Sequence, residues 1–196
     1  MREWIELVNS DWHGHLGHGP DQDRLDDPQW LAKFLADSGL PRVDPRAETV
    51  QGALKKLRGL LKRIVDSCLA GKPVSDADLA TLNRYLANEL VYPQVRRQNR
   101  SMRMELTTSG KGLEAVLFSL TAAVADFLVQ EDVGRLRACS NPNCRWIFFD
   151  ATRSRTARWC GGTCRSLIKV RAHRQHRKTE LRSERANKRK KSRKRL

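Results

Sequence analysis

The sequence predicts an α+β fold that is mainly helical, and three observations lead to this prediction. Stripes of apolar residues recur at helical spacing along the first two-thirds of the 196 residues. One stretch near residue 100 alternates apolar and polar residues, which is typical of a strand. Two close pairs of cysteines follow, and after them the chain is dominated by Lys and Arg. We therefore expect an N-terminal helical domain with a small antiparallel hairpin over residues 1–134, a four-cysteine module with a basic helix over residues 135–180, and a basic tail over residues 181–196 that is disordered in isolation.

Charge is distributed unevenly along the chain. It holds 38 Lys and Arg against 22 Asp and Glu, a net charge of +16. Residues 135–196 carry 21 of the basic and 3 of the acidic residues, a net of +18, and residues 1–134 carry the other 17 and 19, a net of −2. A polyanion would therefore be attracted to the C-terminal third and not to the rest.

The sequence gives no reason to expect a membrane protein. No apolar run approaches the roughly 18–20 residues of a membrane span. The N-terminus begins Met1-Arg2-Glu3 and lacks the basic-then-apolar order of a signal peptide. We expect a cytoplasmic protein, and because thiols stay reduced there, its five cysteines favour a metal site or a free thiol over disulfides.

The first two predicted helices have clear start and stop signals. Asp27–Pro28 is an N-cap followed by proline at the first helical position, and Gly39 is typical of the residue that ends a helix. Asp44–Pro45 repeats the start signal, and Gly71 ends the apolar stripe that follows. The stripe consists of Val50, Leu54, Leu57, Leu61, Ile64 and Cys68. Its spacing predicts a helix in which Cys68 is a buried small apolar residue.

Two further helices flank the predicted hairpin in the sequence. Ser75 with Asp78 three residues later resembles a capping box. Leucines at helical spacing follow it, at Leu79, Leu82, Leu86 and Leu90. Residues 102–107 alternate apolar and polar side chains and predict a strand, for which residues 91–98 are a partner across a turn at residues 99–101. Helical spacing returns in Leu113, Val116, Leu117, Leu120, Val124, Phe127 and Leu128.

The helical part offers little that resembles a catalytic site, and we expect no enzyme. Asp11 with His13, His15 and His18 forms a glycine-rich cluster that could hold a metal or an anion. Its spacing matches no common ligand pattern, and no nucleophile–base pair accompanies it, so a polar loop is the favoured interpretation. The stretch 109–112 could hold a phosphate on backbone N–H groups, but it lacks the rest of a phosphate-binding loop and is better interpreted as a helix start.

The most specific pattern is four cysteines in two close pairs. Cys139 and Cys144 form the first pair, and Cys160 and Cys164 follow after fifteen residues. Four thiolates near one another suit one tetrahedral ion, and zinc is the usual occupant of such a site. Because four ligands leave no open position, one zinc ion there would be structural. Four unrelated cysteines or a redox centre are the alternatives, and the lack of a Cys-x-x-Cys pair argues against the redox centre.

The segment between the pairs supports a compact zinc module. Residues 145–150 are rich in aromatic and β-branched residues and predict a short strand, with residues 151–157 as the turn and return. Trp146, Phe148 and Trp159 are expected to form the small core of the module rather than to stack on bases. Metal binding would contribute to the folding of such a small unit.

The layout Cys-x4-Cys-Arg-Trp-x-Phe-x-Asp, then Arg-Trp-Cys-x3-Cys and a basic segment, resembles the CGNR zinc finger of bacterial proteins. The segments 6–10, 23–25 and 30–31 resemble the start of the helical ABATE domain, which commonly precedes that finger. The resemblance covers most of residues 1–180 and implies a stress-induced transcription regulator.

The resemblance also assigns residues. It matches Cys139, Cys144, Cys160 and Cys164 to the zinc ligands, and Trp146, Phe148, Asp150 and Trp159 to the framework of the finger. Lys169 matches a basic helix position. The signature Cys-Gly-Asn-Arg reads Cys-Arg-Ser-Leu at residues 164–167, so only its cysteine is retained. Any role of the family's Asn and Arg therefore does not carry over to this chain.

Fifteen Lys and Arg in the 32 residues after Cys164 favour binding to nucleic-acid phosphates. The first part of this segment predicts a helix that could enter the major groove of DNA. The candidate contact residues are Arg165, Lys169, Arg171, Arg174, Arg177 and Lys178. We expect a DNA-binding transcription regulator whose N-terminal domain senses a small ligand or a protein partner. An RNA- or ribosome-binding zinc protein is the alternative, and the lack of an RNP-like aromatic strand favours DNA.

Overall fold

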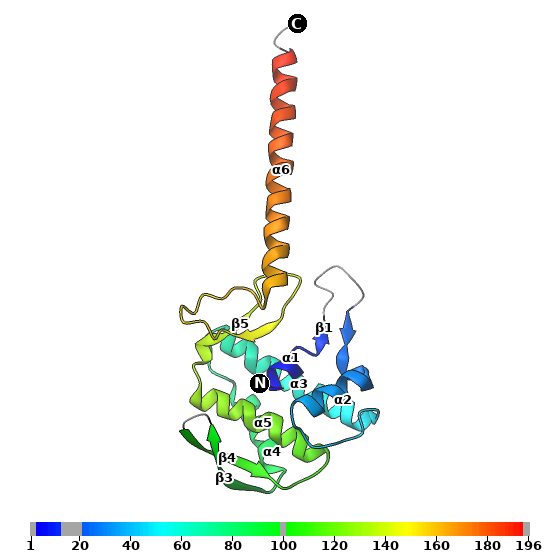
Figure 1. The fold of residues 1–196 in the computed structure, drawn as a ribbon, viewed down its shortest axis with the longest axis vertical. Coiled ribbons are helices and arrows are strands. Elements are labelled where there is room, and N and C mark those ends of the chain that lie inside the picture. Colours follow the sequence, from blue (N-terminus) through cyan, green and yellow to red (C-terminus); the bar gives the residue numbers. More distant parts are fainter. Residues whose placement is uncertain (1–2, 13–20, 99–100, 194–196) are drawn as a thin grey trace.

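The computed structural model describes residues 3–12, 21–98 and 101–193, and its fold is α+β and mainly helical, as the sequence predicts. Figure 1 shows a helical body from which one long helix projects. The helices are α1 (Glu3–Val8), α2 (Pro28–Asp37), α3 (Glu48–Leu69), α4 (Asp76–Ala87), α5 (Leu113–Gln130) and α6 (Gly162–Arg193). The strands are β1 (Asp11–Trp12), β2 (Gln22–Asp23), β3 (Val91–Gln98), β4 (Ser101–Thr108), β5 (Leu136–Ala138) and β6 (Ile147–Phe149). In the described part of the chain these strands form three antiparallel pairs, β1–β2, β3–β4 and β5–β6. A short 3-10 helix, η1 (Arg24–Asp26), precedes α2, and a second, η2 (Val133–Arg135), precedes β5.

Of the three helix starts predicted from capping residues, two are confirmed. The Asp27 carboxylate accepts hydrogen bonds from the backbone N–H groups of Gln29 and Trp30, and the Ser75 hydroxyl accepts one from the N–H of Asp78. The prediction that Asp44–Pro45 begins a helix is wrong, because α3 begins at Glu48. The Asp44 carboxylate and carbonyl accept from the N–H groups of the next turn, at Arg46 and Ala47, and so close a separate turn ahead of the helix.

The core of the body is built on the predicted α3 stripe. Its first five members, Val50, Leu54, Leu57, Leu61 and Ile64, are buried and pack with apolar residues of α1, α2 and α5. Cys68, the last member, is only half-buried, and burial raises the pKa of its thiol. A thiol that stays protonated on an apolar surface is inert, so the structure agrees with a packing role for Cys68.

The apolar stripe predicted for α4 is largely wrong. Of its four leucines only Leu82 is buried, while Leu79 is 37 % exposed. Leu90 lies beyond the end of α4 and is 89 % exposed. The leucines share a helical spacing in the sequence, but the helix stops at Ala87, so Leu90 does not share the buried face.

Helix α5 corrects the expectation that no apolar run reaches the length of a membrane span. Leu113–Gln130 has 18 residues and a mean hydropathy of 1.6, which by length and composition is enough to cross a membrane. In the structure α5 contacts α1, α3 and α4, and eight of its residues, such as Val116 and Leu120, are buried in the body. A core helix surrounded by other helices is apolar for that reason.

The start of α5 settles the phosphate-loop alternative. The helix begins directly after Gly112, which has φ +84° and is its N-cap, as a helix start predicts. The Glu89 carboxylate lies directly beside Gly110 and would have to move if this residue carried a Cβ. This negative charge beside the backbone N–H groups would repel a phosphate, so the interpretation as a helix start is confirmed.

A buried arginine ties the N-terminal segments to α3. Arg58 is 9 % exposed and donates hydrogen bonds to the Ser10 hydroxyl and to both carboxylate oxygens of Asp23. Burial acts to raise the pKa of Asp23, but the hydrogen bonds from Arg58 and from the Leu25 N–H outweigh it and hold that pKa below its ordinary value. The ionised Asp23 carboxylate, held by Arg58, therefore anchors β2 and η1 on α3.

The strand pairing of the cysteine module differs from the prediction. The partner of β6 is β5, which precedes the first cysteine, with Leu136 opposite Phe149. Residues 151–157 form turns and irregular structure and not a return strand. The side chains of the β5–β6 pair explain this choice, because Leu136 and Ile147 are buried in the core of the helical body.

Helix α6 continues through the segment that the sequence predicts to be disordered in isolation, and it is described as helical to Arg193. The segment after Gly162 has no Gly or Pro and is rich in strong helix formers such as Arg, Lys and Glu. Its behaviour alone in solution stays a prediction, as do the domain boundaries at residues 134 and 180. His13, His15 and His18 lie outside the described residues, so the polar-loop interpretation of their cluster also stays a prediction.

Candidate metal centre

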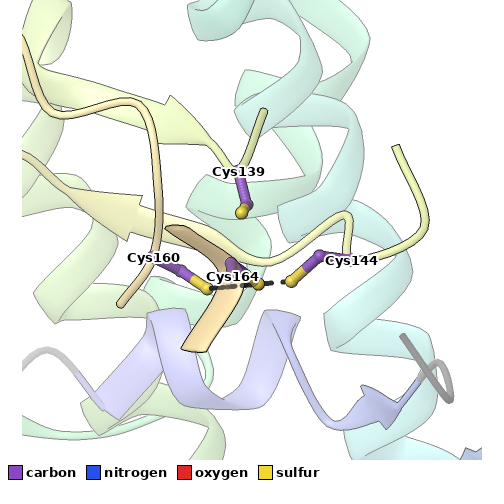
Figure 2. Close-up of side chains that lie close together, drawn as sticks. All are labelled: Cys139, Cys144, Cys160 and Cys164. Carbon is purple, nitrogen blue, oxygen red and sulfur yellow. Dashed lines mark hydrogen bonds between the residues drawn. The ribbon is translucent and has the colours of Figure 1, made fainter. Parts of the chain in front are cut away.

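Four separate segments bring the cysteines together (Figure 2). Cys139 directly follows β5, and Cys144 lies in the loop before β6. Cys160 lies just before α6, and Cys164 is in the first turn of that helix. All four Sγ atoms lie within 4.8 Å of one another.

The sulfur distances fit one tetrahedral ion. The Cys160 Sγ lies 3.7 Å from the Sγ of Cys144 and 3.7 Å from that of Cys164. A tetrahedron with Zn–S bonds of about 2.3 Å has S–S edges of about 3.8 Å. The same distances are far too long for a disulfide, whose S–S bond is about 2.05 Å. The four cysteines therefore form a site for one structural zinc ion.

The site is shielded from water. Cys139, Cys144 and Cys164 are buried, Cys160 is half-buried, and three aromatic side chains pack against them. These are Trp146, Phe148 and Trp159, the residues predicted to form the small core of the module. A four-thiolate shell with this cover leaves no position for a substrate, which is the mark of a structural site.

Backbone and side-chain hydrogen bonds hold the first knuckle. The Asn141 carbonyl accepts from the N–H of Cys144 at 2.9 Å, and the Asn141 side-chain amide donates to the Cys164 Sγ at 3.5 Å. Asn141 is fully buried. The sequence does not predict this contact between Asn141 and a zinc ligand that is 23 positions away. Arg145 has φ +55°, a left-handed conformation that lets the chain turn from the knuckle into β6.

The thiols could not all ionise without a cation. Burial raises the pKa of Cys144 to about 12 and also raises that of Cys160, where the neighbouring thiols add to the effect. At Cys139 burial acts in the same direction, but backbone hydrogen bonds at Cys160 and Asn141 outweigh it and lower the pKa. Cys144 and Cys160 therefore require the positive charge of a dication to ionise.

Asp150 holds the loop that leads to the second pair. Its carboxylate is 1 % exposed and accepts hydrogen bonds from the N–H and hydroxyl of Thr152 and from the N–H of Ala157. The hydrogen bonds of Thr152 are the main reason that the pKa of Asp150 lies below its ordinary value. Because the carboxylate spans the base of the loop, it helps to set where Cys160 returns to the site.

Asn9 joins the module to the helical body. Its side-chain amide donates to the Ile147 carbonyl at 2.8 Å, and its amide oxygen accepts from the Ile147 N–H at 2.8 Å. Arg24 stacks near Trp30 on one side and Trp146 on the other, at 5.9 Å from each ring centroid. The sequence does not reveal the contacts of Asn9 with Ile147 and of Arg24 with Trp146, because in both cases the partners are more than 100 positions apart.

We expect Asn9→Ala to lower the free energy of unfolding by about 2–4 kcal/mol, because it leaves two buried backbone groups of Ile147 without a partner. Urea unfolding measures this loss, and hydrogen exchange at the Ile147 amide should become faster. Asn83→Ala, at an exposed position on α4, is the matched control and should change little. Equal stability of the two variants would contradict this assignment.

The six candidate contact residues lie on the first part of α6. Arg165, Lys169, Arg174, Arg177 and Lys178 are exposed, and Arg171 is half-buried. They do not share one face. Arg165 and Lys169 are four residues apart and lie together, whereas Arg171, Arg174 and Lys178 line a different side of the helix. The structure thus presents positive charge around the helix and not as a single stripe.

Comparison with known families agrees with this geometry. Residues 2–131 match the ABATE family, described as "Putative stress-induced transcription regulator", and residues 135–177 match the CGNR zinc finger. No curated protein matches the chain with significant similarity. The ABATE match covers more than half of the chain, and the second match spans the four cysteines and the root of α6. The chain therefore belongs to the ABATE family and carries a zinc finger of the CGNR type at its C-terminal end.

Proposed function

We propose that this protein is a DNA-binding transcription regulator that uses its zinc module to present α6 to DNA. The observation that carries the proposal is the position of Cys164, which is both a zinc ligand and a first-turn residue of the basic helix. Figure 1 shows α6 leaving the body next to β5. A rigid root with an exposed basic helix is the arrangement that a groove-binding helix requires.

The charge on α6 supports duplex DNA as the partner. A helix in the major groove is flanked by a phosphate backbone on each side, and positive charge on more than one side of α6 suits that position. Five of the six candidate residues are exposed, so they can contact phosphates or base edges.

The hypothesis of a non-enzymatic cytoplasmic protein is in keeping with the matched families, neither of which is described as an enzyme.

The proposal also gives the helical body a sensing role. A cleft of about 240 Å³ lies between α1, α3 and the zinc module. Both signs of charge line it, since Asp11, Lys62, Asp66 and Arg145 all face it. A small polar ligand bound there would touch α3 and the residue next to Cys144 at once. We therefore place the sensed ligand in this cleft.

Gel-shift titration of the full chain against duplex DNA over a salt series tests the proposal. We expect the logarithm of the binding constant to fall steeply and linearly with the logarithm of salt concentration, with a slope of about −0.9 for each phosphate contacted. In competition, duplex DNA should displace structured RNA more readily than the reverse. Failure to shift duplex DNA at low salt would overturn the proposal, and preferential binding of RNA would support the RNA-binding alternative instead.

A further inference from the structure

The hairpin β3–β4 has one apolar face and one polar face. Residues paired across two antiparallel strands point to the same side of the sheet. The pairs Pro93–Leu106, Val95–Met104 and Arg97–Met102 therefore lie on one face, with Val91 at its end. We call this set the outer face, namely Val91, Pro93, Val95, Arg97, Met102, Met104 and Leu106. The pairs between them, such as Gln94–Glu105, form the other face.

On β4 the polar face, and not the apolar one, lies against the body, whereas residues 91–97 of β3 are exposed on both faces. Arg103 forms an ion pair with Asp126 of α5. Arg103, Glu105 and Thr107 are half-buried, whereas the alternate residues of β4, Met102, Met104 and Leu106, are 64 %, 70 % and 58 % exposed. An antiparallel sheet with one covered face ordinarily covers its apolar side. This hairpin does the opposite, so its apolar side lacks the layer that would bury it.

The outer face exposes a large part of the apolar area that one partner contributes to a dimer. Val91 and Val95 are 38 % and 67 % exposed. Taking roughly 150 Å² for a whole Val, Leu or Met side chain, these two residues and the three of β4 expose roughly 450 Å² of apolar surface, compared with about 800 Å² per partner in a standard interface. Pro93 and Arg97, which are also exposed, extend the outer face further.

The distribution of charge permits a second copy at this face. Arg97 is the only charged residue of the outer face, and residues 1–134 carry a net charge of only −2. The strongly basic α6 projects from the other end of the body (Figure 1). Two copies that meet through their hairpins keep most of their positive charge farther apart than a Debye length of about 8–10 Å, so repulsion between them is weak. A strongly charged partner would find only Arg97 on this face to pair with.

We propose that the outer face of β3–β4 is the interface through which two copies of this chain form a dimer. The same face of each copy packs on the other across a two-fold axis, which buries the Val, Met and Leu side chains of both. The inference is independent of the DNA-binding proposal, since it concerns the opposite end of the molecule.

Light scattering coupled to size exclusion, on the full chain, tests the proposal. We expect the unmodified protein to have twice its chain mass of 22.4 kDa. Met104→Asp and Leu106→Asp each place a charge in the centre of the interface and should give monomers. Leu181→Asp makes the same chemical change at a 48 % exposed position on α6, away from the hairpin, and should leave the dimer intact.

Each other outcome would overturn the proposal. If the unmodified chain is a monomer, the dimer proposal is wrong. This holds even if the outer face is found to bind lipid vesicles or another protein. A dimer that persists in Met104→Asp and Leu106→Asp would place the interface elsewhere. Zinc content and helical circular dichroism of each variant should equal those of the unmodified chain, because the substituted side chains are exposed in the monomer. A loss of either would show that the hairpin has a folding role instead.

Discussion

Replacement of Cys160 by serine is expected to reduce the zinc content from about one ion per chain to none. The hydroxyl of serine is a poor zinc ligand at neutral pH, and three thiolates hold the ion much more weakly than four. Zinc accounts for about 10–16 kcal/mol of apparent binding free energy in isolated finger peptides. Loss of the ion should therefore unfold the loops around Cys139 to Cys164, while the core around α3 and α5 persists.

Metal analysis and circular dichroism of the full chain measure this effect. Cys68→Ser is the matched control, since Cys68 is the only cysteine outside the cluster and is half-buried against the body. It should keep one zinc ion per chain. Acid should also release the metal from the unmodified protein, because protons compete with zinc for the thiolates as the pH falls. Retention of a full equivalent of zinc in Cys160→Ser would contradict the four-cysteine assignment.

Removal of residues 181–196 is expected to weaken DNA binding by orders of magnitude at moderate salt. The segment carries nine Lys and Arg against one acidic residue. Each phosphate contact that is lost lowers the magnitude of the salt slope by about 1. The weakening should be nearly uniform across DNA sequences, because contacts to phosphates carry no sequence information.

Two further variants test whether the charge of the tail causes the loss of binding. One keeps the length of the chain, and the other removes charge from a different part of the protein. Replacement of residues 188–191, which read Lys-Arg-Lys-Lys, by serines keeps the length and should give a large part of the loss. Lys56→Ala with Arg84→Ala removes two exposed charges from the helical body and should leave the slope unchanged. If the truncated chain binds DNA with an unchanged slope, the basic tail is not in contact with phosphates.

Local patterns in the sequence predicted the fold best for those features that depend on residues close together in the chain. The caps at Asp27 and Ser75, the α3 stripe and the four-cysteine cluster are all confirmed. The start of α3 was misplaced because an aspartate–proline pair suits a turn as well as a helix start. The apolar composition of α5 was underestimated because its polar residues, such as Thr121, are spread around the helix and interrupt each run.

The contacts that position the zinc module could not be predicted from spacing. The partner of β6 is decided by burial of Leu136 and Ile147 in a core whose other members come from distant helices. Asn9 and Asn141 are small polar residues without a pattern of their own, and their importance follows only from being buried beside Ile147 and Cys164. For the same reason the alternation in β4 predicted a strand but not which of its faces the body would cover.

Because the first turn of α6 contains the zinc ligand Cys164, any tilt of the helix at the zinc site moves its far end by a larger distance. From Cys164 to Arg193 the helix is about 44 Å long at 1.5 Å per residue. A tilt of only about 10° at the zinc shell would therefore swing its far end by about 8 Å, more than two base-pair steps of 3.4 Å. Small changes in the packing of Asn141 or Asp150 would thus produce a large displacement of the C-terminal end of α6 along bound DNA.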